Sequence, residues 1–195
     1  MKKAPILIAL LCSFSLHAQD FQPDSIAIKR HAINKINLSI LSAWAGLNIV
    51  QGGIAASNAQ NSDKYFHQTN VYWNVVNLAI AGYGFWQLRK ELGRQYTLAE
   101  NIEAQQKIEK LLLLNSGLDL AYMTTGMYLN ERGKRLTDNQ LKGVGNSLVM
   151  QGGFLLIFDI IQYAIHRNNG KALLKAFPGM QITPASQGLG LAVRF

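Results

Sequence analysis

The chain is poor in the residues and motifs that most enzymes use. It has a single cysteine, Cys12, so no intramolecular disulfide can form. No glycine-rich phosphate loop follows a strand, and no Ser or Cys nucleophile stands in a recognisable motif. No paired carboxylates share a local segment either. These absences argue against an enzyme, and the sequence predicts neither a cofactor nor a metal.

Charge is also scarce, and it is clustered. Asp, Glu, Lys and Arg make up only 15% of the chain, and residues 36–62 and 65–88 contain none of them. The net charge of +8 could indicate a nucleic-acid partner. However, the basic residues flank apolar segments instead of lining one face, so we expect no nucleic acid.

The N-terminal segment Met1–Ala18 has the features of a secretory signal peptide. Lys2 and Lys3 precede the apolar run Ala4–Leu16, and Ala18 offers a cleavage site. An uncleaved N-terminal anchor is the alternative, although the run is short for a membrane span. We therefore expect export to the bacterial envelope, followed by loss of residues 1–18 together with Cys12.

Residues 19–170 are expected to form four long helices. The hydrophobic periodicity and the helix-end signals place them at about 25–57, 63–92, 98–132 and 138–168. Helices of this length joined by short loops favour an antiparallel up-down-up-down bundle, so the predicted fold is all-α.

Local signals at the helix ends support these limits. Thr97 and Glu100 form a Thr-x-x-Glu capping box, and the same spacing recurs in residues 137–140. Gly93, Gly133 and Gly170 are each expected to end a helix.

Each predicted helix carries a narrow polar stripe on an otherwise apolar surface. In the run Leu111–Asn130, for example, Asn115, Asp119 and Tyr122 recur at steps of four and three residues. A soluble helix shows the reverse pattern, an apolar stripe and a broad charged face. Apolar stretches of about 20 residues also match a hydrocarbon layer of about 30 Å. The pattern favours a transmembrane bundle whose polar stripes face inward.

A soluble periplasmic helical bundle is the alternative. Spans that carry Asn and Asp insert only marginally, and an Asp at the centre of a span costs about 3 kcal/mol on insertion scales.

The polar stripes define the candidate binding residues of the bundle interior. They are Asn48, Gln51, Asn74, Asn77, Asn115, Asp119, Tyr122 and Gln151. Asp119 is the sharpest candidate, because no Lys or Arg within the apolar spans can pair with it and burial should favour the neutral acid. It would either line a path for a proton, a cation or a small polar solute, or make an interhelical hydrogen bond that holds the bundle together.

A second polar group lies near the end of the fourth predicted helix. Asp159, Gln162 and His166 share one face there, and His31 should approach them from the first helix. Side chains of this kind at a helix end are more often solvated than bound to metal, so no metal site is expected.

The tail, residues 171–195, differs from the bundle. Residues 171–177 favour a short interfacial helix, with Lys171 and Lys175 at the level of the lipid headgroups. Leu189, Leu191 and Val193 then alternate with smaller residues, which predicts a β-hairpin-like end.

Two signals conflict over the orientation in the membrane. The antiparallel arrangement gathers most Lys and Arg residues at the end that holds the start of the first helix. The positive-inside rule places that end in the cytoplasm, whereas a cleaved signal peptide delivers the new N-terminus outside. The orientation therefore stays open, and the inner membrane is favoured over the outer one.

The whole pattern resembles that of small exported four-helix membrane proteins of unknown function found in bacterial genomes. The resemblance supplies no catalytic motif. We expect a non-enzymatic assembly or interaction module of the envelope, embedded in the lipid bilayer, whose protein partner is a second copy or another envelope protein. The alternative is a small transporter or channel component that uses Asp119.

Overall fold

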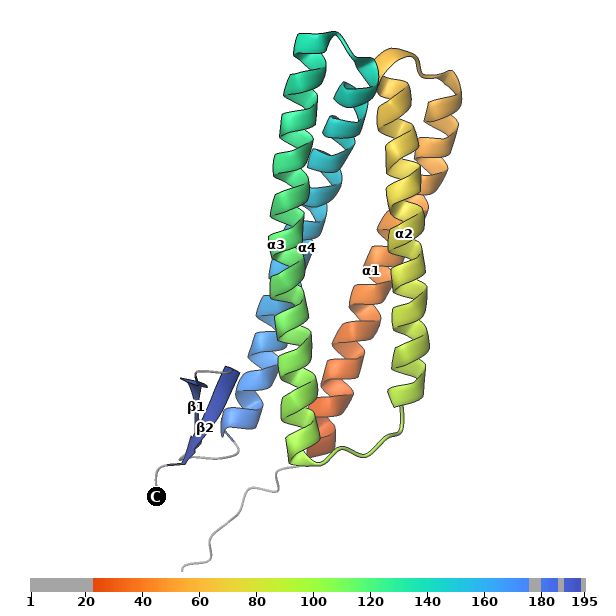
Figure 1. Cartoon of the computed structure of the whole chain (residues 1–195). Helices are drawn as coiled ribbons and strands as arrows, with labels where there is room; N and C mark the ends of the chain where they lie inside the picture. Colours follow the sequence, from red (N-terminus) through yellow and green to blue (C-terminus); the bar gives the residue numbers. More distant parts are fainter. Residues whose placement is uncertain (1–22, 176–179, 186–187, 194–195) are drawn as a thin grey trace, which may run out of the picture.

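The computed structural model describes residues 23–175, 180–185 and 188–193, and it shows four long helices (Figure 1). These are α1 (Pro23–Asn58), α2 (Asn61–Glu91), α3 (Leu98–Leu136) and α4 (Asn139–Lys175). The prediction of an all-α four-helix fold is confirmed. The predicted signal peptide, with Cys12, lies outside the described residues.

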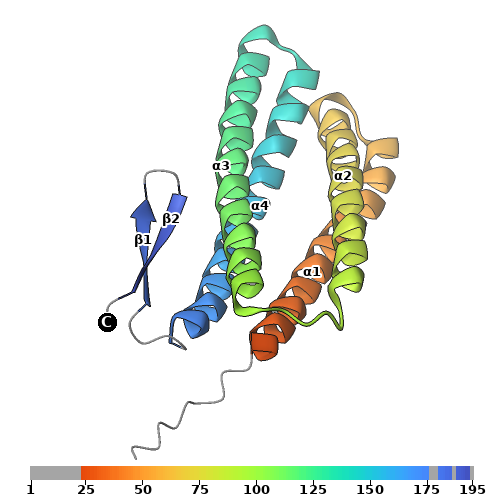
Figure 2. The same ribbon diagram turned by 60° about the horizontal axis from the view of Figure 1, so that its bottom comes forward.

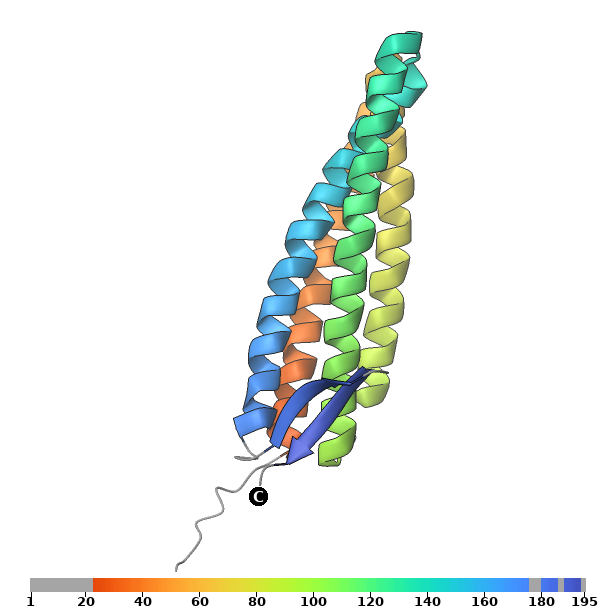
Figure 3. The same ribbon diagram turned by 60° about the vertical axis from the view of Figure 1, so that its left-hand side comes forward.

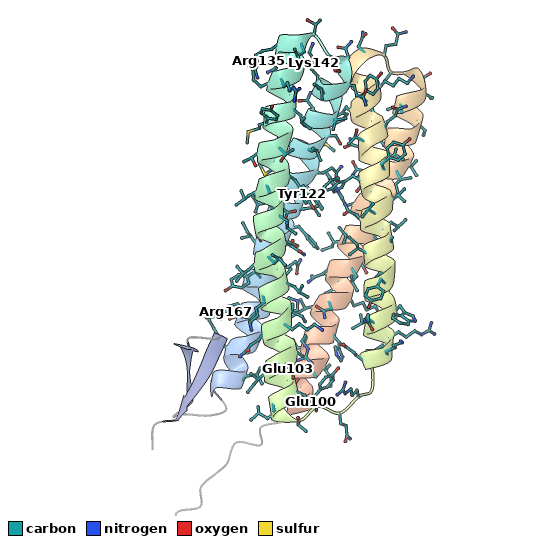
Figure 4. The ribbon with its side chains drawn as sticks, in the orientation of Figure 1. Glu100, Glu103, Tyr122, Arg135, Lys142 and Arg167 are labelled. Atoms are coloured by element: carbon teal, nitrogen blue, oxygen red, sulfur yellow. The ribbon has the colours of Figure 1, made fainter. Side chains whose placement is uncertain are left out.

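The helices form two antiparallel hairpins, α1–α2 and α3–α4, that stand side by side in up-down-up-down order (Figures 1 and 3). At one end lie the two short turns, and we call it the turn end. At the other end lie the start of α1, the α2–α3 connection and the end of α4. We call it the basic end, because it carries Lys29, Arg30, Lys35, Arg89, Lys90, Arg94 and Arg167. Figure 4 shows Arg167 and Glu100 toward this end and Arg135 and Lys142 at the turn end.

Glycines allow the helix backbones to approach one another closely near the turn end. A Cβ atom on Gly145 would lie 2.5 Å from the carbonyl oxygen of Gly126 on α3. A Cβ atom on Gly143 would meet the carbonyl oxygen of Ser62 and lie 2.7 Å from the backbone nitrogen of Phe66, both on α2. Small residues at such crossings permit backbone contact, so α4 is packed against both α3 and α2.

Two of the predicted helix-end signals are confirmed. Thr97 and Glu100 form the capping box at the start of α3, with the Glu100 side chain accepting a 2.9 Å hydrogen bond from the Thr97 backbone N–H. This bond, with those from the Thr97 hydroxyl and from Arg94, lowers the pKa of Glu100. Gly93 has a φ of +80° just after α2, as a helix-ending glycine should.

The predicted boundary between α3 and α4 is wrong. α3 continues past Gly133 to Leu136. Gly133 allows close packing instead of ending the helix, because a Cβ atom added there would lie 2.7 Å from the backbone nitrogen of Lys142. Thr137 is the left-handed residue after α3, with a φ of 55°, and forms no capping box. The carboxylate of Asp138 instead accepts hydrogen bonds from the backbone N–H groups of the next turn, at 2.8 and 3.0 Å.

The predicted end of α4 is also wrong. The helix runs through Gly170 to Lys175, so residues 171–175 continue α4 and do not form a separate interfacial helix. Gly170 faces α3 inside the helix, where a Cβ atom would lie 2.8 Å from the carboxylate oxygen of the Glu109 side chain. After α4, strands β1 (Met180–Ala185) and β2 (Gly188–Val193) pair antiparallel, with Met180 opposite Val193.

The distribution of polar and apolar side chains is inverted relative to a soluble bundle. Among the described residues, fifteen buried side chains are polar or charged and eight are hydrophobic. Large apolar side chains cover the outside instead, and Leu47, Ile54 and Ile157 are 71%, 66% and 63% exposed. The interior of this protein is therefore a polar column, and its outer surface is apolar.

Candidate functional site in the polar interior

A network of neutral side chains ties three helices together in the half of the bundle nearer the turn end. The side-chain oxygen of Asn70 on α2 accepts hydrogen bonds from Ser147 and Gln151 on α4, at 2.5 and 3.2 Å. Gln151 in turn accepts a 3.0 Å hydrogen bond from the indole N–H of Trp44 on α1. Because Asn70, Ser147 and Gln151 are fully buried, these bonds hold the two hairpins in register.

Three further buried amides line the same interior, but they bond within their own helices. The amide of Asn48 donates to the carbonyl of Trp44 at 2.9 Å, and that of Asn74 donates to the carbonyl of Asn70 at 2.8 Å. Asn77 donates to the side-chain oxygen of Asn74 at 3.4 Å. These side chains satisfy part of their own hydrogen-bonding capacity and keep the interior polar.

Two buried acids, Asp119 on α3 and Asp159 on α4, lie close enough to interact electrostatically. Their exposed fractions are 3% and 6%. Asp159 accepts a hydrogen bond from the side chain of Asn115, whereas Oδ2 of Asp119 has no hydrogen-bond partner within the described residues. No described cation lies within ion-pair distance of either carboxyl group. Two buried carboxyl groups that interact in this way favour sharing a proton or binding a cation between them.

The antiparallel packing of α3 on α4 explains this pairing. A Cβ atom on Gly152 would lie 2.9 Å from the carbonyl oxygen of Asp119, so this glycine marks where the two helices touch. Asp159 lies two turns after Gly152 on α4. Because α3 runs in the opposite direction, Asp159 comes to lie beside Asn115, which is one turn before Asp119 on α3. Neither helix alone reveals this juxtaposition.

Aromatic side chains close the interior between α2 and α3. The rings of Trp73 and Tyr122 meet edge to face with centroids 4.8 Å apart, and Tyr122 is half-buried between the two helices (Figure 4). On the other side of the interior, Trp44 stacks on Phe154 at 3.7 Å.

A second buried cluster lies at the basic end, where the α2–α3 connection crosses the start of α1 (Figure 2). Arg30 is 1% exposed, and its Nη1 donates a 2.8 Å hydrogen bond to the side chain of Asn101. Its guanidinium and that of Arg94 lie 5.0 and 5.1 Å from the ring centroid of Tyr96. The buried Arg30 therefore contacts an aromatic ring and an amide, and no ion pair to a carboxylate is present within the described residues.

Asp159, Gln162 and His166 lie on one buried face of α4, so the prediction that they share a face is confirmed and the expectation that they are solvated is wrong. His166 lies 3.5 Å from the side chain of Asn37, and its backbone carbonyl accepts a hydrogen bond from Gln105 on α3. His31 lies against Tyr96 and 3.5 Å from the carboxylate of Glu91. In the described part of the chain, no three His, Cys, Asp or Glu side chains are arranged to hold a metal ion.

Comparison with protein families shows that residues 40–160 match a family of unknown function. The chain belongs to this family, DUF6992. Comparison with curated proteins and with solved structures gives no match. The part matched by DUF6992 contains the Asn70 network and both acids, and it leaves out Arg30 and His166. The polar interior is thus within the family region, whereas much of the basic end is outside it.

Most of the candidate residues lie in the interior as the sequence predicts, but Gln51 and Asn115 are exposed. Asn48, Asn74, Asn77, Asp119 and Gln151 are buried in the interior, all within the DUF6992 region. Gln51 is exposed, which corrects its prediction: the neighbouring Gly52 faces α2, and a Cβ atom there would lie 3.0 Å from Val71. Asn115 is exposed although it bonds Asp159.

Proposed function

We propose that this DUF6992 member is an integral membrane protein of the bacterial envelope that acts as a non-enzymatic assembly or interaction module. The observation that carries the proposal is the inverted distribution of side chains, with amides and acids inside and large apolar residues outside. In water such a surface would cost free energy at every exposed Leu and Ile, whereas in lipid it is the favourable arrangement.

The composition of two helices gives independent support. The helical segments Ser25–Asn58 and Asn139–Lys171 are long and apolar enough to cross a membrane, and their apolar 18-residue windows have mean hydropathies of 1.3 and 1.7. The apolar core helix of a soluble protein passes the same test, but it is mostly buried. Here only 17% and 22% of the two apolar windows are buried, so their apolar side chains face outward.

The other two helices are less apolar, and the proposal accounts for this. α2 and α3 contribute buried polar residues to the interior, among them Asn70, Asn74, Asn101 and Asp119. These inward polar residues lower the mean hydropathy of α2 and α3, although lipid would not contact them.

Extraction of membranes at alkaline pH tests the membrane proposal. The expressed full-length chain should stay in the pellet after carbonate treatment and appear in the supernatant only with detergent. Release by carbonate alone would overturn the proposal and leave a soluble periplasmic bundle.

The role as an assembly module is supported by how the interior polar groups are used. Asn70, Ser147 and Gln151 hydrogen-bond one another across helices, as in membrane proteins that use polar side chains to associate helices. The outer apolar surface is then free to contact lipid, a second copy or another envelope protein.

A second candidate function is movement of a proton or cation through the bundle, and the acid pair favours it. Asp119 and Asp159 are buried together without an ion-paired Lys, Arg or His in the described residues. A pair of acids that shares one proton can release and rebind it when a pathway to water exists on both sides.

Proton flux into vesicles separates the two functions. Purified protein is reconstituted with an internal pH-sensitive dye, and a potassium gradient with valinomycin supplies the driving potential. If the protein transports protons, vesicles that contain it should acidify faster than empty vesicles. The Asp119→Asn and Asp159→Asn variants should lose this faster acidification. The control Asp63→Asn, which alters an exposed acid at the turn end, should keep it. Wild-type flux equal to that of empty vesicles would rule out proton movement and leave the assembly module.

A further inference from the structure

A groove opens between α1 and α2 at the basic end, and neither the acid pair nor the Asn70 network uses it. Its volume is about 710 Å³, which is within the range of sites that hold small molecules. The floor is apolar and includes Ala27, Phe85 and Leu88. The rim is basic and includes Lys35, Arg89 and Arg94.

The positive charge of this rim is only partly neutralised. Arg94 pairs with Glu100 at 2.6 Å, and His31, which also lines the groove, lies 3.5 Å from Glu91. Lys35 and Arg89 have no carboxylate within ion-pair distance among the described residues.

A buried group adds to the positive potential of the groove. Arg30, the neighbour of His31 in α1, is 1% exposed, and its Nη2 has no hydrogen-bond partner within the described residues. The carboxylate of Glu91 interacts with Arg30 electrostatically but is not within ion-pair distance, so the buried guanidinium still adds positive potential, because the low-dielectric interior screens its charge poorly. The groove thus combines an apolar floor with cations that the nearby carboxylates neutralise only in part.

Aromatic residues of α2 one to two turns before the basic rim match the surroundings of a membrane–water interface. Tyr83 and Trp86 on α2 are 60% and 51% exposed, and they lie one to two turns before Arg89. Aromatic residues of this kind gather at the level of lipid headgroups, with Lys and Arg just beyond them. The apolar floor would then lie toward the hydrocarbon layer and the basic rim among the headgroups.

We propose that this groove binds an anionic phospholipid, with an acyl chain against Phe85 and Leu88 and the headgroup phosphate between Lys35 and Arg89. Basic pockets between membrane helices recognise anionic headgroups in this manner. The inference rests on the proposed membrane location, because only a protein in the bilayer meets the lipid at this depth.

Lipid binding to the purified full-length chain tests the proposal. Native mass spectrometry in a non-ionic detergent counts bound dioleoylphosphatidylglycerol, with dioleoylphosphatidylcholine as the zwitterionic comparison. The test variant is Lys35→Gln with Arg89→Gln. The control is Lys64→Gln with Arg132→Gln, which removes two exposed cations from the turn end that also have no described ion pair.

The wild-type chain and the control should prefer phosphatidylglycerol. The test variant should bind it about 25-fold more weakly, since each basic residue near an anionic headgroup contributes on the order of fivefold. Equal binding of the two lipids by the wild-type chain, or an unchanged preference in the test variant, would overturn the proposal. A preference lost equally in the control would also overturn it, because net charge would then explain the binding.

Failure of this inference is distinguishable from failure of the membrane proposal. Carbonate extraction is run on the wild-type chain and on both double variants, and circular dichroism checks that each variant keeps its helix content. A chain that resists extraction but lacks the lipid preference loses only the lipid site. A chain released by carbonate loses both proposals.

Discussion

Alanine in place of two glycines of α4 tests the contact between the two hairpins. Gly143 and Gly153 lie in the same helix, ten residues apart, but their surroundings differ. A Cβ atom on Gly143 would meet the backbone of α2 at Ser62 and Phe66, whereas one on Gly153 would have nothing within 4 Å. The same substitution should therefore have opposite effects at the two positions.

The size of each effect follows from two opposing contributions. Alanine inside a helix is favoured over glycine by about 0.5–1 kcal/mol. Overpacking costs about 1–3 kcal/mol, and at Gly143 the obstacle is backbone 2.7 Å away at Phe66, which cannot rotate aside. Gly153→Ala should thus stabilise the protein by up to about 1 kcal/mol. Gly143→Ala should destabilise it by about 1–2 kcal/mol.

Unfolding of the purified chain in detergent measures both values. Helix content is followed by circular dichroism while sodium dodecyl sulfate is titrated into mixed micelles, and the midpoints of Gly143→Ala, Gly153→Ala and the wild-type chain are compared. Equal midpoints for the two variants would mean that α4 does not touch α2 at Gly143. The packing of the two hairpins described above would then be wrong.

Two further substitutions test the interior network and a helix end with the same unfolding assay. Asn70→Ala leaves Ser147 and Gln151 without their shared acceptor and should lower the free energy of unfolding by about 1–3 kcal/mol. Asn58→Ala, at the exposed end of α1, should change it little. Equal losses of stability in the two variants would show that the network contributes no stability. Thr137→Gly should stabilise the protein by up to about 1 kcal/mol, because the left-handed φ of 55° strains any residue with a Cβ atom. A loss of stability in this variant would contradict that backbone geometry.

The fold was largely predictable because its signal is local. Each helix repeats a polar stripe at steps of three and four residues, and the Thr97 capping box and Gly93 limit helices through interactions within one turn. Gly133 and Gly170 misled the prediction because their function is not local. Gly133 lies where the backbone of α4 leaves no room for a side chain, and Gly170 lies against side chains of α3. A single sequence does not separate such contacts from helix termination.

The site was predictable only in part, because it depends on the register between helices. The burial of Asp119 can be predicted from the polar stripe of its own helix. The proximity of Asp159 to Asp119 can be predicted only from the register between α3 and α4. The stripe on α1 was drawn through Gln51, whereas the inward residue is Gly52. The burial of Arg30 has no signal in its own helix, because it results from the α2–α3 connection that brings Tyr96 against it.

The outward-facing apolar surface can be tested at Leu47, which is 71% exposed and lies near the middle of the uncharged part of α1. Leu47→Cys and Arg132→Cys are made separately in a Cys12→Ser background, and membrane fragments open on both sides are treated with a water-soluble maleimide. A bilayer around the bundle predicts that the thiol of the Leu47→Cys variant reacts only after detergent is added, while the thiol of the Arg132→Cys variant, at the turn end, reacts at once. Rapid labelling of both variants without detergent would show that water, not lipid, surrounds the bundle.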